Sequence, residues 1–574
     1  MLDFQIITDK KNNTKYIETS INGKFLLNIS QLNKGTAFTQ EERHTFSLLG
    51  KLPHRVEQLS EQVQRAYLQY SDYKTKLQKS IYLNNLHDKN QILFYKLLSA
   101  YLDEMLPIIY TPVVSISVQK YSHKYRQPRG LYITHLDIDY IDEILNNRSN
   151  PDIDLIVVTD GEGVLGIGDQ GVGGMDIPIA KLMVYSLCGG IDPLKTLPIT
   201  LDIGTNNQTL LNDSLYLGCR NARITGKQYD IFITKFVEAI NRHFPKVFLH
   251  WEDFGLNNAR RILENFQDKL CSFNDDIQGT GAVTIAALLA ACDITKNPLV
   301  NNKIIIFGAG TAGIGIADQI VDALVRLGST ESEAVKNLWL IDRQGLIVQS
   351  DNTINPAQKK YARQNIDIET WQYNTEYPSL LETIENIQPT VLIGCSAQYQ
   401  AFSQKIIQTM TTYCDMPIIF PLSNPDEKCE AVPNDILIWS QGKALIATGT
   451  EFNNVKYNDI SIRIAQCNNA LIFPGLGLGI LAVGAKRLTK NMIWSAVYSL
   501  KNNAPCLQHP QLPLLPALGD AQAVAKNIAI AVAKSAIHEG LATKNQNVDL
   551  LQLIDQIYWI PEYLPYKESK NAKS

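Results

Sequence analysis

The pattern of hydrophobic and polar positions changes at about residue 107. Residues 36–106 are polar with helical periodicity, and the apolar side chains of the stretch 90–105 recur at three- and four-residue steps, as on a helix with one buried face. Pro107 is expected to end this helix, and the stretch 108–112 is expected to be extended. The pattern therefore predicts a helical N-terminal region.

From residue 107 to about residue 280, short β-branched runs alternate with helical segments. Four of these runs end in an acidic residue, at 155–160, 198–202, 247–253 and 271–276. This alternation predicts parallel strands with crossover helices. Because the carboxyl ends of parallel strands meet at one sheet edge, where open α/β sheets bind ligands, a cluster of carboxylates is expected in a cleft.

A second α/β unit is predicted from Asn302 onward. A buried strand at 303–307 precedes Gly308, Gly310 and Gly313, which match G-x-G-x-x-G, and an amphipathic helix follows. In that order the glycines let the backbone approach a pyrophosphate, and the helix N-terminus faces its charge. Asp342, at the end of the next strand, is placed to bind a ribose 2′-hydroxyl and to repel a 2′-phosphate, which favours NAD over NADP. Its spacing from Gly313 exceeds the usual ~20 residues, so a longer crossover is expected.

The same glycine pattern occurs once more, from Gly166 to Gly171. There the runs 155–159 and 164–168 are expected to form a hairpin, and the next helix is expected to begin only near Pro178, because further glycines intervene. One alternative is a glycine-rich hairpin that only packs tightly. The other is a loop that delivers Lys181 to the acidic edge, where an ionisable group among apolar neighbours could lose its proton and act as a base.

The acids at the strand ends could bind a metal ion. Glu252, Asp253 and Asp276 offer hard oxygen ligands of the kind that Mg²⁺ and Mn²⁺ prefer. The alternative is that these acids cap helices, since Asp and Glu favour first turns. Asp275 could instead pair with Lys181 and hold it in place.

Three further side chains are candidates for substrate chemistry. Asn424 and Asn469 lie in strand-end loops and could donate to a carboxylate without adding charge, although Asn is also common in turns. Tyr110 has a core role as its default interpretation. A phenol beside a lysine and a metal would nevertheless be a proton donor.

Composition narrows the class of protein. The chain has 574 residues, 45% of them hydrophobic and 19% charged, which is typical of a globular protein of two to four domains. A net charge of −4, with 53 basic and 57 acidic residues spread along the chain, argues against nucleic-acid or membrane partners. The N-terminus lacks a signal-peptide pattern and the apolar run 470–485 is too short to span a bilayer, so a soluble, cytoplasmic protein is expected. Nine scattered cysteines without a C-x-x-C pair are expected to be reduced thiols.

Several long motifs in one order resemble the malic enzymes and their malolactic relatives over nearly the whole chain. They lie at 32–38, 108–112, 157–162, 251–254, 273–280, 422–425 and 466–469. The resemblance implies an α/β protein with a helical N-terminal region at 1–83, a parallel-sheet malate and metal domain at 84–273, a Rossmann-like NAD-binding domain at 274–540 and a C-terminal extension at 541–574. It also implies L-malate as substrate, NAD and Mn²⁺ or Mg²⁺ as cofactors, and a homodimer or homotetramer.

The resemblance also assigns roles to individual residues. It implies that Tyr110 and Lys181 are the catalytic acid and base, with Asp275 as the partner of the lysine. The implied metal ligands are Glu252, Asp253 and Asp276, the malate-binding residues are Asn424 and Asn469, and the NAD-binding residues are Gly308, Gly310, Gly313, Asp342 and Asn424.

The chain departs from the malic enzyme pattern at Gly163. Malic enzymes have Asp-Gly-Glu-Arg there, and a guanidinium suited to pair with a carboxylate is absent from this chain. The malolactic branch resembles the chain at that point. Malolactic conversion of L-malate to L-lactate and CO₂ is therefore the first hypothesis, NAD-linked release of pyruvate the second and a non-catalytic NAD-binding protein the third. Ser115 and Ala180 also replace glycines that are usual in malic enzymes.

Overall fold

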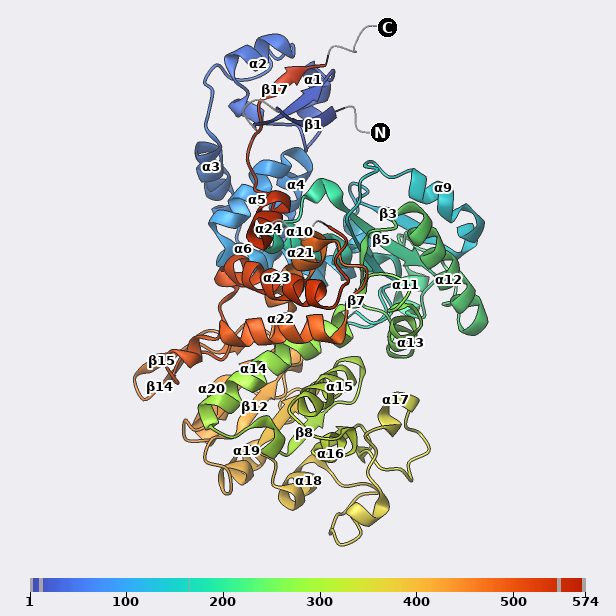
Figure 1. Ribbon diagram of the computed structural model, residues 1–574, viewed down its shortest axis with the longest axis vertical. Helices are drawn as coiled ribbons and strands as arrows, with labels where there is room; N and C mark the ends of the chain where they lie inside the picture. The colour runs from blue at the N-terminus through green and yellow to red at the C-terminus, as the bar shows by residue number, and fades with distance from the viewer. Residues whose placement is uncertain (1–3, 10–13, 165, 545–548, 570–574) are drawn as a thin grey trace.

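The structure is a computed structural model that describes residues 4–9, 14–164, 166–544 and 549–569. One α/β lobe lies at the right side of the view and the second at the lower end of the molecule, and helices from residues 470–540 lie beside the first lobe and above the second (Figure 1). The N-terminal helices and the end of the chain lie together beside the first lobe. The first and last segments of the chain therefore share one part of the molecule.

The N-terminus begins with strands, not helices. Strand β1 (Phe4–Thr8) pairs antiparallel with β2 (Lys15–Thr19), and β17 (Tyr566–Glu568) adds to β2 in parallel. Residues 567–569, from the basic and polar end of the chain, bond to β2 and its flank. Residues 570–574 lie outside the described part of the chain.

The predicted helical region follows, but its end differs from the prediction. Helices α3 (Leu59–Ser71), α4 (Lys76–Lys89), α5 (Gln91–Ala100) and α6 (Leu102–Ile109) succeed one another. The chain breaks at Tyr101, where φ is −132° and ψ is 46°, and Pro107 lies inside α6. The extended stretch expected at 108–112 is therefore wrong for Ile108 and Ile109, and also for Pro112, which has φ of −91° and ψ of −10°. Burial of the apolar face of α6 outweighs the one hydrogen bond that a proline removes.

The first lobe contains a five-stranded sheet in which every described neighbour pair is parallel. The strand order is β3 (Leu131–Thr134), β5 (Thr196–Asp202), β4 (Leu155–Thr159), β6 (Phe248–Trp251) and β7 (Ser272–Asn274). The connections are helices α10 (Asp176–Gly189), α12 (Gly226–His243) and α13 (Leu256–Phe266). The predicted parallel strands with acids at their ends are confirmed. The sequence pattern missed β3.

The hairpin predicted around Gly166 is absent from the described residues. β4 has β5 on one side and β6 on the other, so it has no free edge, and Val164 bridges only to Gly168. Leu165 lies outside the described residues. The 3₁₀ helix η3 (Gly171–Met175) begins at Gly171 and continues into α10, so the helix starts earlier than predicted. Gly173 does not interrupt it, because its role is close packing: an added Cβ would lie 2.8 Å from the Val118 carbonyl oxygen.

The second lobe contains a seven-stranded sheet with the predicted strands. Their order is β10 (Gly345–Leu346), β9 (Leu338–Asp342), β8 (Ile304–Phe307), β11 (Val391–Gly394), β12 (Ile418–Pro421), β13 (Leu445–Thr448) and β16 (Ala465–Gln466). All described pairs are parallel except β9 with β10. Helices α15 (Thr311–Arg326) and α16 (Glu331–Lys336) both connect β8 to β9, which explains the long spacing from Gly313 to Asp342.

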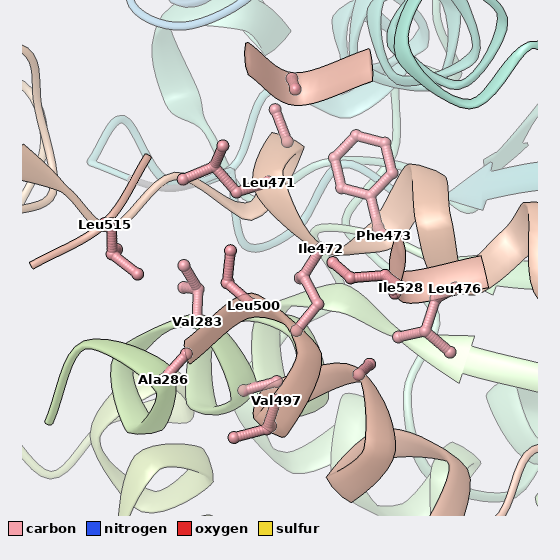
Figure 2. Packing of buried hydrophobic residues seen from close by; sticks show 14 of the residues in the cluster. Val283, Ala286, Leu471, Ile472, Phe473, Leu476, Val497, Leu500, Leu515 and Ile528 are labelled. Atoms are coloured by element: carbon pink, nitrogen blue, oxygen red, sulfur yellow. The ribbon is translucent and has the colours of Figure 1, made fainter. Parts of the chain in front are cut away.

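The layer between the sheets consists of apolar helices. Its members are α14 (Thr280–Thr295), α21 (Phe473–Val483), α22 (Lys490–Asn502) and α23 (Ala521–His538). Val283, Phe473 and Ile528 from three of them meet in one buried cluster (Figure 2). Residues 275–295 are long and apolar enough to cross a membrane, yet 78% of their most apolar window is buried inside the protein, as in a core helix. Each of the nine cysteines lies in the described part and is free.

Candidate active site

A cavity of about 300 Å³ lies between the two lobes. Its lining includes the predicted site residues Tyr110, Lys181, Glu252, Asp253, Gly310, Asn424 and Asn469. Asp275 and Asp276 do not line it but contact the lining residues Lys181 and Asp253, respectively. Gly308, Gly313 and Asp342 do not line it. The tertiary structure thus brings the predicted acid, base, metal and substrate residues to one place, with part of the glycine loop.

Lys181 lies on α10 with 3% of its surface exposed. Its Nζ contacts Asp275 Oδ2, lies 3.0 Å from Glu252 Oε1 and is 5.3 Å from the centre of the Tyr110 ring. Burial by itself would lower the pKa of Lys181, but Asp275 and Glu252 outweigh burial and hold that pKa well above its usual range. The immediate neighbours of the ammonium are therefore carboxylates as well as the apolar side chains expected from the sequence.

The three predicted metal ligands form a buried cluster. Oxygens of Glu252, Asp253 and Asp276 lie within 4.8 Å of one another. Burial raises the pKa of Glu252 to about 8 and the pKa of Asp276 well above its usual range. Three buried carboxylates so close together repel one another unless a cation joins them, and their hard oxygens suit Mg²⁺ or Mn²⁺. The donor set fits the predicted metal.

Backbone geometry aims two of these acids. Asp253 has φ of 57°, a left-handed conformation that non-glycine residues adopt under strain and that is common at functional sites. Its N–H donates to Asp276 Oδ2 at 2.8 Å. Asp276 lies in the first turn of the π-helical turn η5 (Asp275–Gly279), as the helix-capping alternative expected, but the side chain that caps η5 is that of Asn274. Gly255 precedes α13 without a side-chain cap, so capping does not account for Glu252 and Asp253.

Two further residues beside Glu252 were not predicted. His250 Nε2 lies 2.6 Å from Glu252 Oε2, and Tyr185 Oη lies 2.8 Å from His250 Nδ1. Burial lowers the pKa of His250 to about 3, so the ring is neutral. The available signal was spacing: His250 is two residues before Glu252 on a strand, and Tyr185 is one helical turn after Lys181.

The two predicted asparagines are held differently. Asn469 Nδ2 donates to Asp275 Oδ2 at 3.0 Å and to Thr280 Oγ1 at 3.1 Å, so Asn469 touches the carboxylate that pairs with Lys181. Asn424 lines the cavity next to Ser423, whose hydroxyl donates to the fully buried Glu430 at 2.6 Å. Glu430 was missed in the sequence analysis. Its carboxylate positions the loop that carries Asn424.

The loop at Gly308 has the geometry of a dinucleotide loop. It connects β8 directly to α15, and Gly308 has φ of 105°. A Cβ on Gly313 would overlap the Gly308 carbonyl oxygen, whereas Gly310 has open space next to it. Gln358, which was also missed, donates through Nε2 to Asp342 Oδ2 at 2.7 Å and to the Ala309 carbonyl oxygen at 3.1 Å. This amide joins the glycine loop to the acid at the end of β9.

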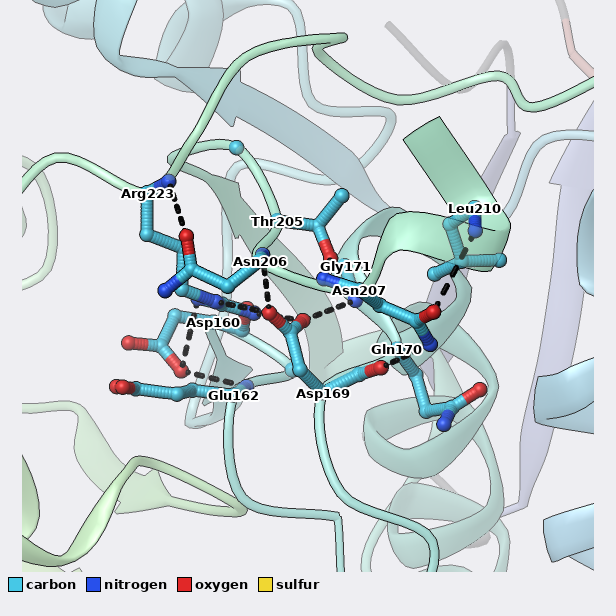
Figure 3. A network of polar contacts seen from close by, with 12 residues as sticks. Asp160, Glu162, Asp169, Gln170, Gly171, Thr205, Asn206, Asn207, Leu210 and Arg223 are labelled. Atoms are coloured by element: carbon cyan, nitrogen blue, oxygen red, sulfur yellow. Dashed lines mark hydrogen bonds and ion pairs between the residues drawn. The ribbon is translucent and has the colours of Figure 1, made fainter. Parts of the chain in front are cut away.

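The loop at Gly166 is built by buried charges. Arg223 donates to both carboxylate oxygens of Asp169, at 2.8 and 2.7 Å, and to the Asp160 carbonyl oxygen at 2.9 Å (Figure 3). A Cβ on Gly166 would lie 2.5 Å from the carbonyl oxygen of Asn424, and Lys428 donates to the Gly166 carbonyl oxygen. This loop therefore contacts the second lobe and leads to Lys181.

Gly163 has no room for a side chain. Its N–H donates to the Asp253 carbonyl oxygen at 2.8 Å, and an added Cβ would lie 2.8 Å from the Phe254 carbonyl oxygen. An arginine at this position would require the loop to move away from Phe254. Ser115 lines the cavity and Ala180 is buried in α10, so neither substitution distorts its helix.

The fold and the cavity define a two-lobed α/β protein with a carboxylate cluster and a buried lysine at the edge of one sheet and a glycine loop at the edge of the other. Residues 87–267 match the family described as malic enzyme, N-terminal domain, and residues 277–537 match malic enzyme, NAD binding domain. The chain belongs to the malic enzyme family.

Named relatives cover almost the whole chain. The NAD-dependent malic enzyme of Photorhabdus laumondii is 47% identical over 95% of this chain and 97% of its own length. That of Acinetobacter baylyi is 46% identical over 95% and 96%, respectively. Among solved structures, Entamoeba histolytica malic enzyme is similar in fold, with a TM-score of 0.56, 22% identity and coverage of 89% of this chain and 90% of that one.

Proposed function

We propose that this protein is an NAD-dependent malic enzyme that converts L-malate and NAD⁺ to pyruvate, CO₂ and NADH with Mg²⁺ or Mn²⁺. The relatives that carry this name are similar over nearly their full length. Malolactic conversion was the first hypothesis from the sequence, and the comparisons favour the second, NAD-linked release of pyruvate, instead. The observation that carries the proposal is Lys181 Nζ, buried between Asp275, Glu252 and the Tyr110 ring at the carboxylate cluster.

In this proposal Lys181 accepts the proton of the C2 hydroxyl of L-malate, and Asp275 holds the lysine in place through their direct contact. Tyr110 later donates a proton to C3 after CO₂ has left; its pKa is raised by burial, so the phenol keeps its proton until then. Glu252, Asp253 and Asp276 would hold the metal. When bound, the metal would supply positive charge that polarises the C2 oxygen and offsets the negative charge of the carboxylates that otherwise keep Lys181 protonated. NAD⁺ would accept the hydride.

The remaining residues position the substrate and the nucleotide. Asn424 and Asn469 would bind malate, and Asn424 also lies where the two lobes meet. Gly308, Gly310, Gly313 and Asp342 would hold NAD in the second lobe. The neutral amide groups suit a substrate carboxylate in a cavity that already contains several acids.

One observation favours malolactic conversion as a second candidate. Among the lining residues, all of which belong to the described chain, Lys181 is the single Lys or Arg. Gly163 leaves no side-chain cation on its loop, so the intermediate and the nicotinamide are held without an arginine there. A site of this kind could retain pyruvate and NADH and return the hydride to give L-lactate.

Product analysis separates the candidates. Purified protein is incubated with L-malate, Mn²⁺ and excess NAD⁺, and NADH absorbance, pyruvate and lactate are measured together. One NADH and one pyruvate per CO₂ are expected; lactate without accumulated NADH would establish malolactic conversion instead. Lys181→Ala should keep NAD⁺ binding and lose turnover, whereas NAD⁺ binding without turnover in the wild type would support a non-catalytic protein.

Assembly, location and domain limits stay predictions. The proposed assembly is a homodimer or homotetramer that uses the N-terminal helices, and light scattering of the purified protein measures it. A cytoplasmic location and the division of the chain after residues 83, 273 and 540 are proposed on the same basis as in the sequence analysis.

A further inference from the structure

We propose that His250, held by Tyr185, is a positioning residue that fixes the carboxylate of Glu252 for metal binding. The inference rests on the proposed function, because it takes Glu252 as a metal ligand. No role is implied for either residue by the motifs that carry the family resemblance. The argument begins with the contacts of the three side chains.

Tyr185, His250 and Glu252 form one buried row. Tyr185 Oη lies 2.8 Å from His250 Nδ1, and His250 Nε2 lies 2.6 Å from Glu252 Oε2. Tyr185 and His250 have no exposed surface, and Glu252 has 4%. Water cannot replace either hydrogen bond at such burial, so loss of one partner leaves the next polar group unsatisfied.

The chemistry of the groups sets the direction of each hydrogen bond. In the ionised form that binds a metal, Glu252 only accepts, so Nε2 of His250 carries the hydrogen and donates to Glu252. Nδ1 is then an acceptor, and the Tyr185 phenol donates to it. Both ring nitrogens of a neutral imidazole are satisfied in this way, and the tautomer is defined by its two neighbours.

The other oxygen of Glu252 has a separate partner. Oε1 lies 3.0 Å from Lys181 Nζ, so His250 and Lys181 hold the two oxygens of the carboxylate from two sides. Each oxygen keeps a further lone pair for a cation. Because the carboxylate cannot rotate without breaking one of these bonds, its orientation is preset before a metal arrives.

Secondary structure explains why both contacts come from the same two elements. Lys181 and Tyr185 are four residues apart on α10 and share one helix face. His250 and Glu252 are two residues apart at the end of β6 and share one sheet face, where the Glu252 N–H still bonds to Val158. One helix face therefore reaches both oxygens of Glu252, directly through Lys181 and through His250 from Tyr185.

Packing also prevents the imidazole from turning. The His250 ring meets the rings of Phe273 and Phe473 edge-on, at centroid distances of 5.3 and 5.8 Å and interplanar angles of 83° and 85°. Aromatic walls on these sides leave the ring with the orientation that its hydrogen bonds require.

His250 could instead be a metal ligand itself, since His250, Glu252 and Asp275 also offer atoms within 4.8 Å of one another. That space already contains a cation, because Lys181 Nζ contacts both Glu252 and Asp275. The Nε2 hydrogen is moreover needed by Glu252. The geometry assigns His250 to positioning and leaves metal binding to the acids.

Equilibrium binding of Mn²⁺ to the full-length protein, without substrate and followed by electron paramagnetic resonance, tests the proposal. His250→Phe keeps an aromatic ring but removes the donor, and it should weaken Mn²⁺ binding about 10- to 100-fold, as is usual for groups that orient metal ligands. His250→Gln restores an N–H donor and should recover most of this loss. Tyr185→Phe removes one hydroxyl and should weaken binding about threefold, in the same direction.

A matched control lies next to His250 on the strand. Trp251 faces the opposite side, and its indole N–H is buried without a hydrogen-bond partner among the described residues, so Trp251→Phe should leave Mn²⁺ affinity unchanged. Steady-state kinetics add a second readout. In His250→Phe the KM for Mn²⁺ should rise by the same factor as the Kd, and kcat at saturating Mn²⁺ should stay within about threefold of wild type.

Three results would overturn the proposal. Wild-type Mn²⁺ affinity in a folded His250→Phe is the first, and a pulsed-resonance signal of nitrogen bound directly to Mn²⁺ is the second, since it would make His250 a ligand. The third is a Tyr185→Phe protein with unchanged Mn²⁺ affinity. If His250→Phe does not fold, the Mn²⁺ affinities of His250→Gln and Tyr185→Phe test the proposal. Wild-type protein that neither binds Mn²⁺ nor turns over malate would remove the proposed function instead, so the two failures are distinguishable.

Discussion

Two loops in this protein share the pattern G-x-G-x-x-G and use it in different ways. The Gly308 loop joins a central strand to a long helix. Gly308 lies against the Cys395 backbone, Gly313 lies against the Gly308 carbonyl oxygen, and Gly310 lies next to open space. The Gly166 loop leads into a 3₁₀ turn. Two of its glycines are closely approached by other parts of the protein, Gly166 by Asn424 and Gly171 by the Tyr216 hydroxyl, whereas Gly168 lies next to open space. A glycine pattern indicates where a backbone is approached closely, but not what approaches it.

The loops also differ in how they are held. Charged side chains hold the Gly166 loop, where Arg223 lies between Asp160 and Asp169. In the Gly308 loop a neutral amide, that of Gln358, bridges the loop to Asp342. The Gly166 loop needs a fixed shape because it contacts both lobes and precedes Lys181. The open space next to Gly310 in the Gly308 loop is where a bound nucleotide is proposed to lie.

The largest effect is expected from Gly313→Ala. The added Cβ would overlap the Gly308 carbonyl oxygen, and two backbone segments cannot separate without moving the start of α15. We expect a loss of about 3 kcal/mol or more in stability and no measurable NAD⁺ binding. Fluorescence titration with NAD⁺ and thermal unfolding measure both; a stable variant with wild-type NAD⁺ affinity would show that the loop is not the nucleotide site.

Arg223→Met should cause the next largest loss of stability, through the Gly166 loop. It leaves the buried carboxylate of Asp160 and the partly buried carboxylate of Asp169 without their cation, and breaking a buried ion pair typically destabilises a protein by about 3–5 kcal/mol. Urea unfolding measures the change. Arg242→Met is the matched control, because its pair with Asp142 is more than half exposed and should contribute less than about 1 kcal/mol. Equal losses in both variants would contradict a special role for the buried network.

The pH dependence of stability should also distinguish the charged loop. Burial raises the pKa of Asp160 to about 6, so the folded protein binds this proton more tightly than the unfolded chain. The contribution of Asp160 to stability is then fully present below about pH 4 and is lost as pH rises through 6. In Asp160→Asn the decline in the free energy of unfolding between pH 4 and pH 7 should be smaller than in the wild type, by roughly 3 kcal/mol at most. Urea unfolding at several pH values measures the slope, and an unchanged slope would assign the titration elsewhere.

The smallest effects are expected from a pair of alanine substitutions at Gly168 and Gly310, each of which has open space for a Cβ. Gly168 has φ of 72°, so alanine there is strained and should lower stability by about 1 kcal/mol without changing the KM for NAD⁺. Gly310 has φ of −81°, so alanine there should leave stability within about 0.5 kcal/mol of wild type. Its methyl group would enter the cavity and weaken NAD⁺ binding about tenfold. Weaker NAD⁺ binding in Gly168→Ala together with unchanged NAD⁺ binding in Gly310→Ala would place the nucleotide at the Gly166 loop instead.

Much of the site could be predicted from the sequence because local order carries the information. Runs of β-branched residues that end in acids, separated by helical segments, imply parallel strands whose ends meet, and Glu252, Asp253 and Asp276 follow from that rule. Lys181 was found because an ionisable group interrupts an apolar helix. The strand, glycine and helix order identified the Gly308 loop in the same way.

Other features depend on contacts between distant segments and have no local signal. The 0% exposed surface of His250 and its bonds to Glu252 and Tyr185 become visible only when α10 packs against the sheet that contains β6. The hairpin expected before Gly166 fails because β4 already has a partner on each side. Pro107 stays inside a helix because tertiary burial of that helix outweighs local propensity.

By itself, then, the sequence determined the class of fold, the sheet edge where the acids gather and the residues able to do chemistry there, since these follow from periodicity and chain order. Tertiary structure alone decided which groups touch: the carboxylates that hold the Lys181 proton, the imidazole that holds Glu252, and the Phe254 carbonyl that leaves Gly163 no room for a side chain. The physical reason is that hydrogen bonds, desolvation and steric contact act over a few ångströms between atoms that are far apart along the chain.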